Sequence, residues 1–180
     1  MTGVDPGLPV ASDRYREVYS GVFRRPRGVE TSAFFGASQK LTSIFGGEWP
    51  SFHDAEITDV HLWRGDVKAG DWDDSNVFPV MTINGRILEA TQPGAVGDSG
   101  RDVLAKLRFH DVDDLKIEGF NHQNAIQGFS VAVRDRGTYA NGEKLPPDFI
   151  VIFERAFGMG ASFHCSRAEV VEAKRVSEGP

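Results

Sequence analysis

The strongest constraint on the fold is a regular alternation of apolar and polar side chains in the middle of the chain. Val103, Ala105, Leu107 and Phe109 are apolar, and the positions between them are mostly basic. Successive side chains of a β-strand point to opposite faces of the sheet, whereas the apolar positions of an amphipathic helix recur every three or four residues. The alternation therefore predicts a β-strand that buries one face and exposes the other.

Related patterns predict strands along most of the chain after residue 56. We expect them at residues 57–63, 77–88, 103–109, 115–119, 129–133, 149–155, 161–165 and onward towards Val171. The segment 149–155 is apolar on both sides, which indicates a central strand. No crossover helices separate the strands, so the sheet should be antiparallel. The predicted fold is mainly β, α+β at most: an antiparallel sheet or two-layer β-sandwich of about seven strands with one short N-terminal helix.

Two positions within these strands predict local irregularities. Ile57 followed by Val60 and Leu62 breaks strict alternation, which favours a β-bulge. Pro79 has no backbone N–H to donate, so it favours an edge strand or a bulge.

The short helix is predicted just before the strands. Leu41, Ile44 and Phe45 follow the i, i+3, i+4 spacing of an apolar helical stripe, and Gly46-Gly47 is suited to end the helix. Residues 1–31 look weakly structured, residues 32–174 form a single β-rich domain, and residues 175–180 should fray.

Composition narrows the classes of protein that remain. The single Cys165 excludes an internal disulfide framework, and no apolar run reaches the ~20 residues that span a bilayer. The start of the chain lacks the pattern of a signal peptide, so we expect a cytoplasmic protein without a membrane partner. The formal net charge of −6 argues against nucleic-acid binding and suits a cationic partner, although it also serves solubility alone.

Motifs for nucleotide binding and for nucleophilic catalysis are absent from the sequence. The glycine-rich residues 94–100 have neither the dinucleotide spacing nor the Gly-Lys-Ser/Thr ending of a phosphate loop. His164 and Cys165 are neighbours on a predicted strand, so their side chains point to opposite faces and cannot form a dyad. We therefore expect no cofactor and no enzymatic activity.

The densest group of unusual residues is the stretch 48–57, at the change from helix to strand. Trp49 and Phe52 are placed to seat the helix against the sheet, and His53 or Asp54 to hydrogen-bond the turn backbone. The amides of Asn121, Gln123 and Asn124 suit the same kind of backbone bridging at a hairpin or bulge. The alternative is a site: a metal-dependent hydrolase or ligand-binding β-module using His53, Asp54 and Glu56, with His61 nearby.

Three stretches of the chain resemble one known family. Residues 44–57, with Trp-Pro-Ser-Phe-His-Asp-Ala-Glu-Ile at their end, residues 115–124 and residues 158–165 are similar to stretches of the immunity protein 50 family of bacterial polymorphic toxin systems. The likeness covers about residues 35–172. The residues that carry the motif are Trp49, Pro50, Phe52, His53, Asp54, Glu56, Phe120, Asn121 and Asn124.

The resemblance implies a small cytoplasmic protein that binds and neutralises a cognate toxin domain in the producing cell, without turnover. An acidic β-scaffold is complementary to a basic partner, such as a nuclease-type toxin. The candidate contact groups are acids expected in exposed loops: Asp71, Asp73, Asp74, Asp111, Asp113 and Asp114.

Overall fold

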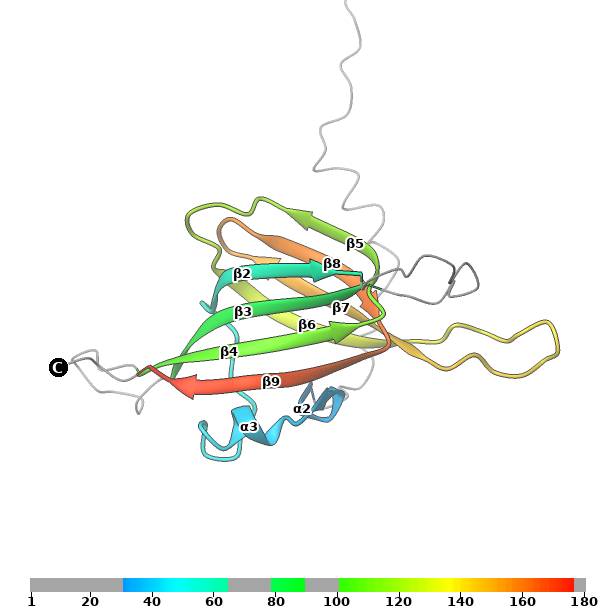
Figure 1. The fold of residues 1–180 in the computed structure, drawn as a ribbon, viewed down its shortest axis with the longest axis horizontal. Coiled ribbons are helices and arrows are strands. Elements are labelled where there is room, and N and C mark those ends of the chain that lie inside the picture. Colours follow the sequence, from blue (N-terminus) through cyan, green and yellow to red (C-terminus); the bar gives the residue numbers. More distant parts are fainter. Residues whose placement is uncertain (1–30, 65–78, 90–100, 177–180) are drawn as a thin grey trace, which may run out of the picture.

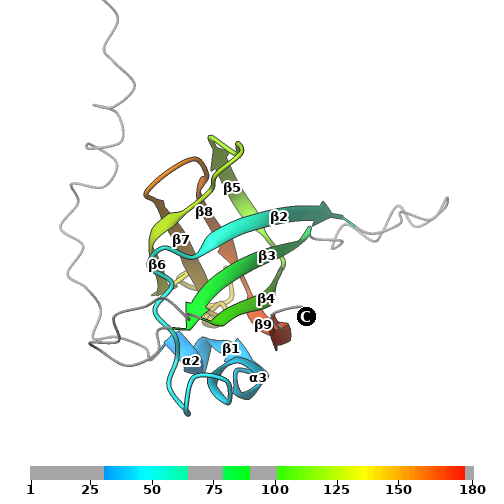
Figure 2. The same ribbon diagram turned by 90° about the vertical axis from the view of Figure 1, so that its left-hand side faces the viewer.

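The computed structural model describes residues 31–64, 79–89 and 101–176, and these residues form two β-sheets packed face to face (Figures 1 and 2). The predicted weak structure of residues 1–30 and fraying of residues 177–180 lie outside the described residues. The elements in chain order are α2 Thr31–Phe34, β1 Phe35–Gly36, α3 Gln39–Thr42, β2 Glu56–Trp63, β3 Val80–Glu89, β4 Arg101–His110, β5 Asp113–Glu118, β6 Ile126–Arg134, β7 Asp148–Arg155, β8 Gly160–Cys165 and β9 Arg167–Arg175.

The predicted fold class is confirmed: the protein is mainly β and its two sheets form a two-layer sandwich. The five-stranded sheet has the order β1-β9-β4-β3-β2, and the four-stranded sheet has the order β5-β8-β7-β6. All pairings are antiparallel except the short parallel pairing of β1 with β9. The strand β7 lies between β8 and β6, which confirms its predicted central position. The division into residues 1–31, 32–174 and 175–180 stays a prediction, although β9 continues to Arg175.

The core lies between the sheets and follows the predicted alternation. Val103, Ala105, Leu107 and Phe109 of β4 are all at most 4% exposed. The ring of Phe109 meets the ring of Phe163 on β8 at a centroid distance of 4.9 Å in an edge-to-face arrangement. This inward row of β4 is therefore one half of the contact that holds the two layers together.

The two predicted irregularities have different outcomes. A register shift between Ile57 and Asp59 in the β2–β3 pairing confirms the bulge. The expectation for Pro79 was wrong, because it lies just before β3, and β3 pairs on both sides with β2 and β4. A proline at the strand entrance costs no ladder hydrogen bond, and its carbonyl accepts one from Val112 N–H at 2.9 Å.

The predicted helix is present as the single turn of α3. Its stripe residue Leu41 is fully buried, and Ile44 and Phe45 pack against the core. Gly47 N–H donates to the Thr42 carbonyl at 2.8 Å, and Gly46 and Gly47 both have positive φ, as a glycine stop predicts. The helix α2 was not predicted, because one turn is too short to show a period. Among the described residues, no helix is long and apolar enough to cross a membrane.

The long hairpin between β6 and β7 extends beyond the sheets (Figure 1) and is anchored by a buried carboxylate at its base. Asp148 is 7% exposed and accepts two hydrogen bonds from the guanidinium of Arg134, one of them at 2.7 Å. This hydrogen bonding raises the pKa of Arg134, and Arg136 stands 3.8 Å from the same carboxylate. The pairing satisfies a charge that would otherwise be costly to bury.

Charges on the outer face of the five-stranded sheet pair with one another across strands. Arg108 and His110 both contact the Glu169 carboxylate, at 3.3 and 3.1 Å. The hydrogen bond from His110 is the main cause that lowers the pKa of Glu169. Arg86 pairs with Asp102 at 3.3 Å on the same face. This face therefore has several partly exposed ion pairs, beside the exposed apolar side chains of Trp63 and Leu104.

Leu41 provides a direct test of how α3 is held. Leu41→Ala should lower the free energy of unfolding by about 2–5 kcal/mol, because it deletes a fully buried side chain and leaves a cavity. Gln39→Ala on the exposed side of the same turn should change it by less than about 0.5 kcal/mol. Urea unfolding of both variants checks this, and equal losses would contradict the docking of α3 on the core.

Candidate functional site

The three stretches that carry the family resemblance meet at one end of the sandwich. The turn before β2 hydrogen-bonds to the start of β6: Asp54 N–H donates to the Ile126 carbonyl at 2.9 Å, and Ile126 N–H donates to the Ala55 carbonyl at 3.0 Å. Ile57 N–H donates to the Asn124 carbonyl at 3.0 Å. These bonds link the edge strand of one sheet to the edge strand of the other. We call this place the junction: the turns at residues 50–55, 119–125 and 156–159.

The amide of Asn124 organises the middle turn of the junction. Its side chain is 4% exposed. The Asn124 Oδ1 accepts the Asn121 N–H at 2.8 Å, and the Asn124 Nδ2 donates to the Asn121 carbonyl at 2.8 Å. The Asn121 Oδ1 in turn accepts the N–H of Gln123 at 2.9 Å. The prediction that the amides of Asn121 and Asn124 bridge backbone groups is confirmed. Gln123 takes part through its main-chain N–H and not through its side-chain amide.

Glycine is required where the third turn meets the second. Gly158 has φ +68°, and a Cβ there would lie 2.1 Å from the Gln123 carbonyl oxygen and 2.7 Å from Asn124 Oδ1. Gly119 has φ +71°, and a Cβ there would lie 2.5 Å from the Gly158 carbonyl oxygen. Both the backbone angle and the close approach exclude other residues. The Ala125 carbonyl completes the contact by accepting the N–H groups of residues 156 and 157, each at 3.0 Å.

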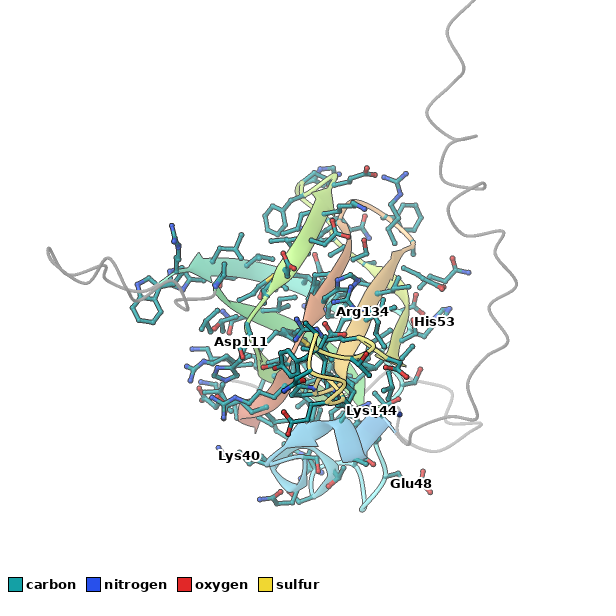
Figure 3. All side chains as sticks on the ribbon, turned by 90° about the vertical axis from the view of Figure 1, so that its right-hand side faces the viewer. Lys40, Glu48, His53, Asp111, Arg134 and Lys144 are labelled. Atoms are coloured by element: carbon teal, nitrogen blue, oxygen red, sulfur yellow. The ribbon has the colours of Figure 1, made fainter. Side chains whose placement is uncertain are left out.

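The side chains of His53 and Asp54 point into solvent. They are 60% and 70% exposed, and His53 Nδ1 lies 2.8 Å from Asp54 Oδ2. Figure 3 shows His53 at the surface, on the opposite side of the view from Asp111. The expectation that these side chains hydrogen-bond the turn backbone was wrong, because Ser51 Oγ accepts the His53 N–H instead, at 3.2 Å. Asp54 contributes through its main chain, which adopts φ 63°.

The structure brings His53 and Asp54 together, and among the described residues no third metal ligand joins them. Glu56 lies half-buried on β2 beside Ala125, and His61 is exposed further along that strand. Within the described ranges, no three His, Cys, Asp or Glu side chains gather in a way that would hold a metal ion. A zinc site needs at least three protein ligands, so the pair alone does not make one.

The aromatic residues of the first stretch pack as predicted. Trp49 stacks on Phe35 of β1 at a centroid distance of 4.9 Å and lies 5.6 Å from Phe52. Phe52 continues the cluster to Phe129 on β6, at a centroid distance of 5.1 Å. Pro50, which follows Trp49 in the chain, is also buried. The stretch therefore seats the N-terminal helical segment against the sandwich. The Trp49 Nε1 is buried and has no hydrogen-bond partner among the described residues.

The predicted contact acids of the β4–β5 turn are exposed and locally engaged. The Asp111 carboxylate accepts a hydrogen bond from Ser166 Oγ, and Asp113 Oδ1 accepts the Asp114 N–H at 2.8 Å. Asp114 lies 3.8 Å from the ammonium of Lys116. Whether they contact a partner stays a prediction. Asp71, Asp73 and Asp74 lie outside the described residues.

A groove that sequence reasoning did not identify lies on the outer face of the four-stranded sheet. It has a volume of about 400 Å³. The β7–β8 and β5–β8 registers place Ile152, Ser162 and Lys116 in one row across it, and Glu118 opposite Gly160 in the next. Small residues at outward positions were visible in the sequence, but their alignment depends on strand register, which the sequence does not provide.

Two exposed phenylalanines mark the end of this groove next to the junction. Phe120 is 51% exposed and follows Gly119, and Phe157 is 64% exposed and precedes Gly158. The close contact of the two glycines brings the loop after β5 beside the β7–β8 turn, as both ribbon views show (Figures 1 and 2). Exposed aromatic side chains on a rigid support are typical of binding surfaces.

Cys165 and His164 occupy opposite faces of β8, as predicted. Cys165 is 1% exposed in the core, and burial is the main cause that raises the pKa of its thiol to about 12. His164 lies on the outer face, where it pairs with Ile150 of β7 and Asp113 of β5. The thiol is therefore un-ionised and shielded, and the two side chains form no dyad.

The comparisons with known proteins find one family. A model described as immunity protein 50 matches residues 37–176, which include the described strands β2 to β9, the junction and the groove. No curated protein and no solved structure matches the chain significantly.

The junction can be tested with a pair of glycine substitutions. Gly158→Ala should lower the free energy of unfolding by about 3 kcal/mol or more, since it adds a steric clash to the cost of a positive φ. Gly142→Ala has a similar φ of +86° with nothing near its Cβ, and should lose only about 1–2 kcal/mol. Urea unfolding measures both, and equal losses would refute the close approach at Gly158.

The thiol of Cys165 should be almost inert in the folded protein. A pKa near 12 leaves far less thiolate at pH 8 than the unfolded thiol has. We expect a disulfide reagent to react about a thousandfold more slowly with the native chain than with the chain in urea. Comparable rates in the two states would show that Cys165 is accessible.

Proposed function

The chain belongs to the immunity protein 50 family, and on this premise we propose that it binds and neutralises a cognate toxin domain in the cell that makes both. The family match carries the proposal, because it extends over residues 37–176. The name of the family implies a toxin as partner. The proposed mode of action is binding alone, with no reaction catalysed.

The architecture suits such an inhibitor. A protein that neutralises by binding gains affinity when its contact surface is already ordered, because little conformational entropy is then lost on association. The junction fixes both edge strands through main-chain hydrogen bonds and close glycine contacts. The two sheets that it joins have a continuous apolar core between them.

The charge of the chain favours a cationic toxin. A net charge of −6 steers a basic partner by long-range attraction and raises the association rate. Nucleases are basic where they hold phosphates, so a nuclease domain is the class of toxin that we propose. The same charge repels nucleic acid itself. We propose action in the cytoplasm, with no nucleic acid, membrane or cofactor involved.

Co-expression with a toxin gene that lies next to the gene for this protein tests the proposal. Cells that express the toxin with this protein should survive, and cells that express the toxin with an empty vector should die. The purified chain should also form a stable stoichiometric complex with the toxin domain. Death at the same rate with and without the protein would overturn the proposal.

A variant at the exposed pair separates binding from catalysis. His53→Ala combined with Asp54→Ala removes the one His–carboxylate pair that the described part of the 48–57 stretch presents to solvent. Protection should persist in this variant, because binding and not turnover is responsible. Protection that disappears while the complex still forms would favour an enzymatic mechanism.

A further inference from the structure

We infer that the toxin docks on the outer face of the four-stranded sheet, over the groove, through an apolar side chain flanked by lysine or arginine residues. The inference rests on the proposed function and adds to it the surface used and the chemistry of the segment that is bound.

The groove is hollow because small residues occupy outward positions on neighbouring strands. Ser162 and Gly160 of β8 lie between the longer side chains of β5 and β7. On the other side of β7, Gly128 of β6 lies opposite Glu154 of β7. The aliphatic stem of Arg155 lies against Gly160, with three of its carbons 3.5–3.6 Å from where a Cβ would stand. The result is a recess large enough for a protruding side chain.

The centre of this face is apolar. Ile150 and Ile152 lie at successive outward positions of β7 and are half-buried rather than covered by another layer. Ala132 faces Ile150 across the β6–β7 pairing. A half-buried apolar centre within a polar rim is the usual anatomy of a protein–protein contact.

The charges that line the groove are balanced. Glu118 and Glu154 are its two acids, and Lys116 and Arg155 are its two cations. Arg155 lies 3.9 Å from Glu118, and Lys116 lies 3.8 Å from Asp114, whereas Glu154 has no ion-pair partner among the described residues. A partner segment with cationic flanks is complementary to Glu154 and to the net charge of −6 of the whole chain.

The two exposed phenylalanines extend the same surface. Phe120 lies two residues beyond the rim residue Glu118, and Phe157 lies between Arg155 and Gly160 in the chain. Aromatic side chains dominate the energy of many interfaces because they bury a large area with few rotatable bonds. The junction, with its glycine contacts, holds both on short, rigid turns.

The outer face of the five-stranded sheet also has paired charges, and it exposes the apolar side chains of Trp63 and Leu104. Arg108 pairs with Glu169 and Arg86 with Asp102 across strands, and Lys174 pairs with Glu172 along β9. These exposed pairs satisfy one another without a partner. Because it also presents charged and apolar side chains, this face is a matched control for the docking surface.

A matched pair of substitutions tests the inference. Ser162→Tyr fills the groove, and Thr82→Tyr makes the same change at a half-buried hydroxyl residue on an inner strand of the opposite outer face. Binding is measured by calorimetry with an inactivated toxin domain from the adjacent gene. Ser162→Tyr should weaken binding by about thirtyfold or more, and Thr82→Tyr by less than about twofold. Thermal unfolding confirms that both variants fold.

A second pair removes side chains and so carries little risk to folding. Phe157→Ala should weaken toxin binding by about tenfold or more. Tyr139→Ala, at an aromatic residue that is 50% exposed on the β6–β7 hairpin, should leave binding unchanged. If wild-type protein binds the toxin and both members of each pair bind alike, the inference is wrong. If wild-type protein does not bind at all, it is the proposed function that fails.

The charge of Glu154 in the groove has its own test. Glu154→Gln should slow association and weaken its dependence on salt, whereas Glu172→Gln on the opposite outer face should not. An unchanged salt dependence in Glu154→Gln would overturn the cationic character of the partner segment. A wild-type dimer that Ser162→Tyr dissociates, with toxin affinity unchanged, would assign the groove to a second copy of the chain and overturn the inference.

Discussion

The arrangement of the protein depends on one close contact between turns. The backbone at Gly158 lies against the Gln123 carbonyl and the Asn124 amide, with no room for a Cβ between them. Asn124 in turn closes the loop that follows β5, and the main chain beside it pairs with the turn before β2. Three segments far apart in sequence are thereby fixed at one end of the sandwich. In the family motif, Asn121 and Asn124 support these main-chain contacts, whereas His53, Asp54 and Phe120 are exposed.

The sequence predicted the layers of the fold better than the site. Period-two alternation identifies strands such as 103–109 because burial on one face leaves a direct trace in residue type. It does not reveal α2 or the parallel pairing of β1, since elements of four and two residues are too short to show a period. The ionisable side chains of His53 and Asp54 favoured a role for those side chains, but they are exposed. The hydrogen bond to Ile126 of β6 is made by the main-chain N–H of Asp54. The groove depends on which small residues meet across strands, and register is set by long-range pairing.

The two outer faces of the sandwich serve different purposes in this account. One face satisfies its own charges through cross-strand pairs such as Arg108 with Glu169. The other has half-buried isoleucines and a recess of about 400 Å³ that is lined by two acids and two cations. A recess beside exposed aromatic side chains is typical of a binding surface. The docking proposed for this family member uses that recess.

The most direct measurement is a titration of methyl-labelled protein with the inactivated toxin domain, followed by nuclear magnetic resonance. Ile150 and Ile152 report on the outer face of the four-stranded sheet, and Leu104 reports on the outer face of the five-stranded sheet. The account predicts that the two isoleucine signals shift or broaden on complex formation while those of Leu104 stay in place. Binding that moves Leu104 and leaves both isoleucines unchanged would contradict it.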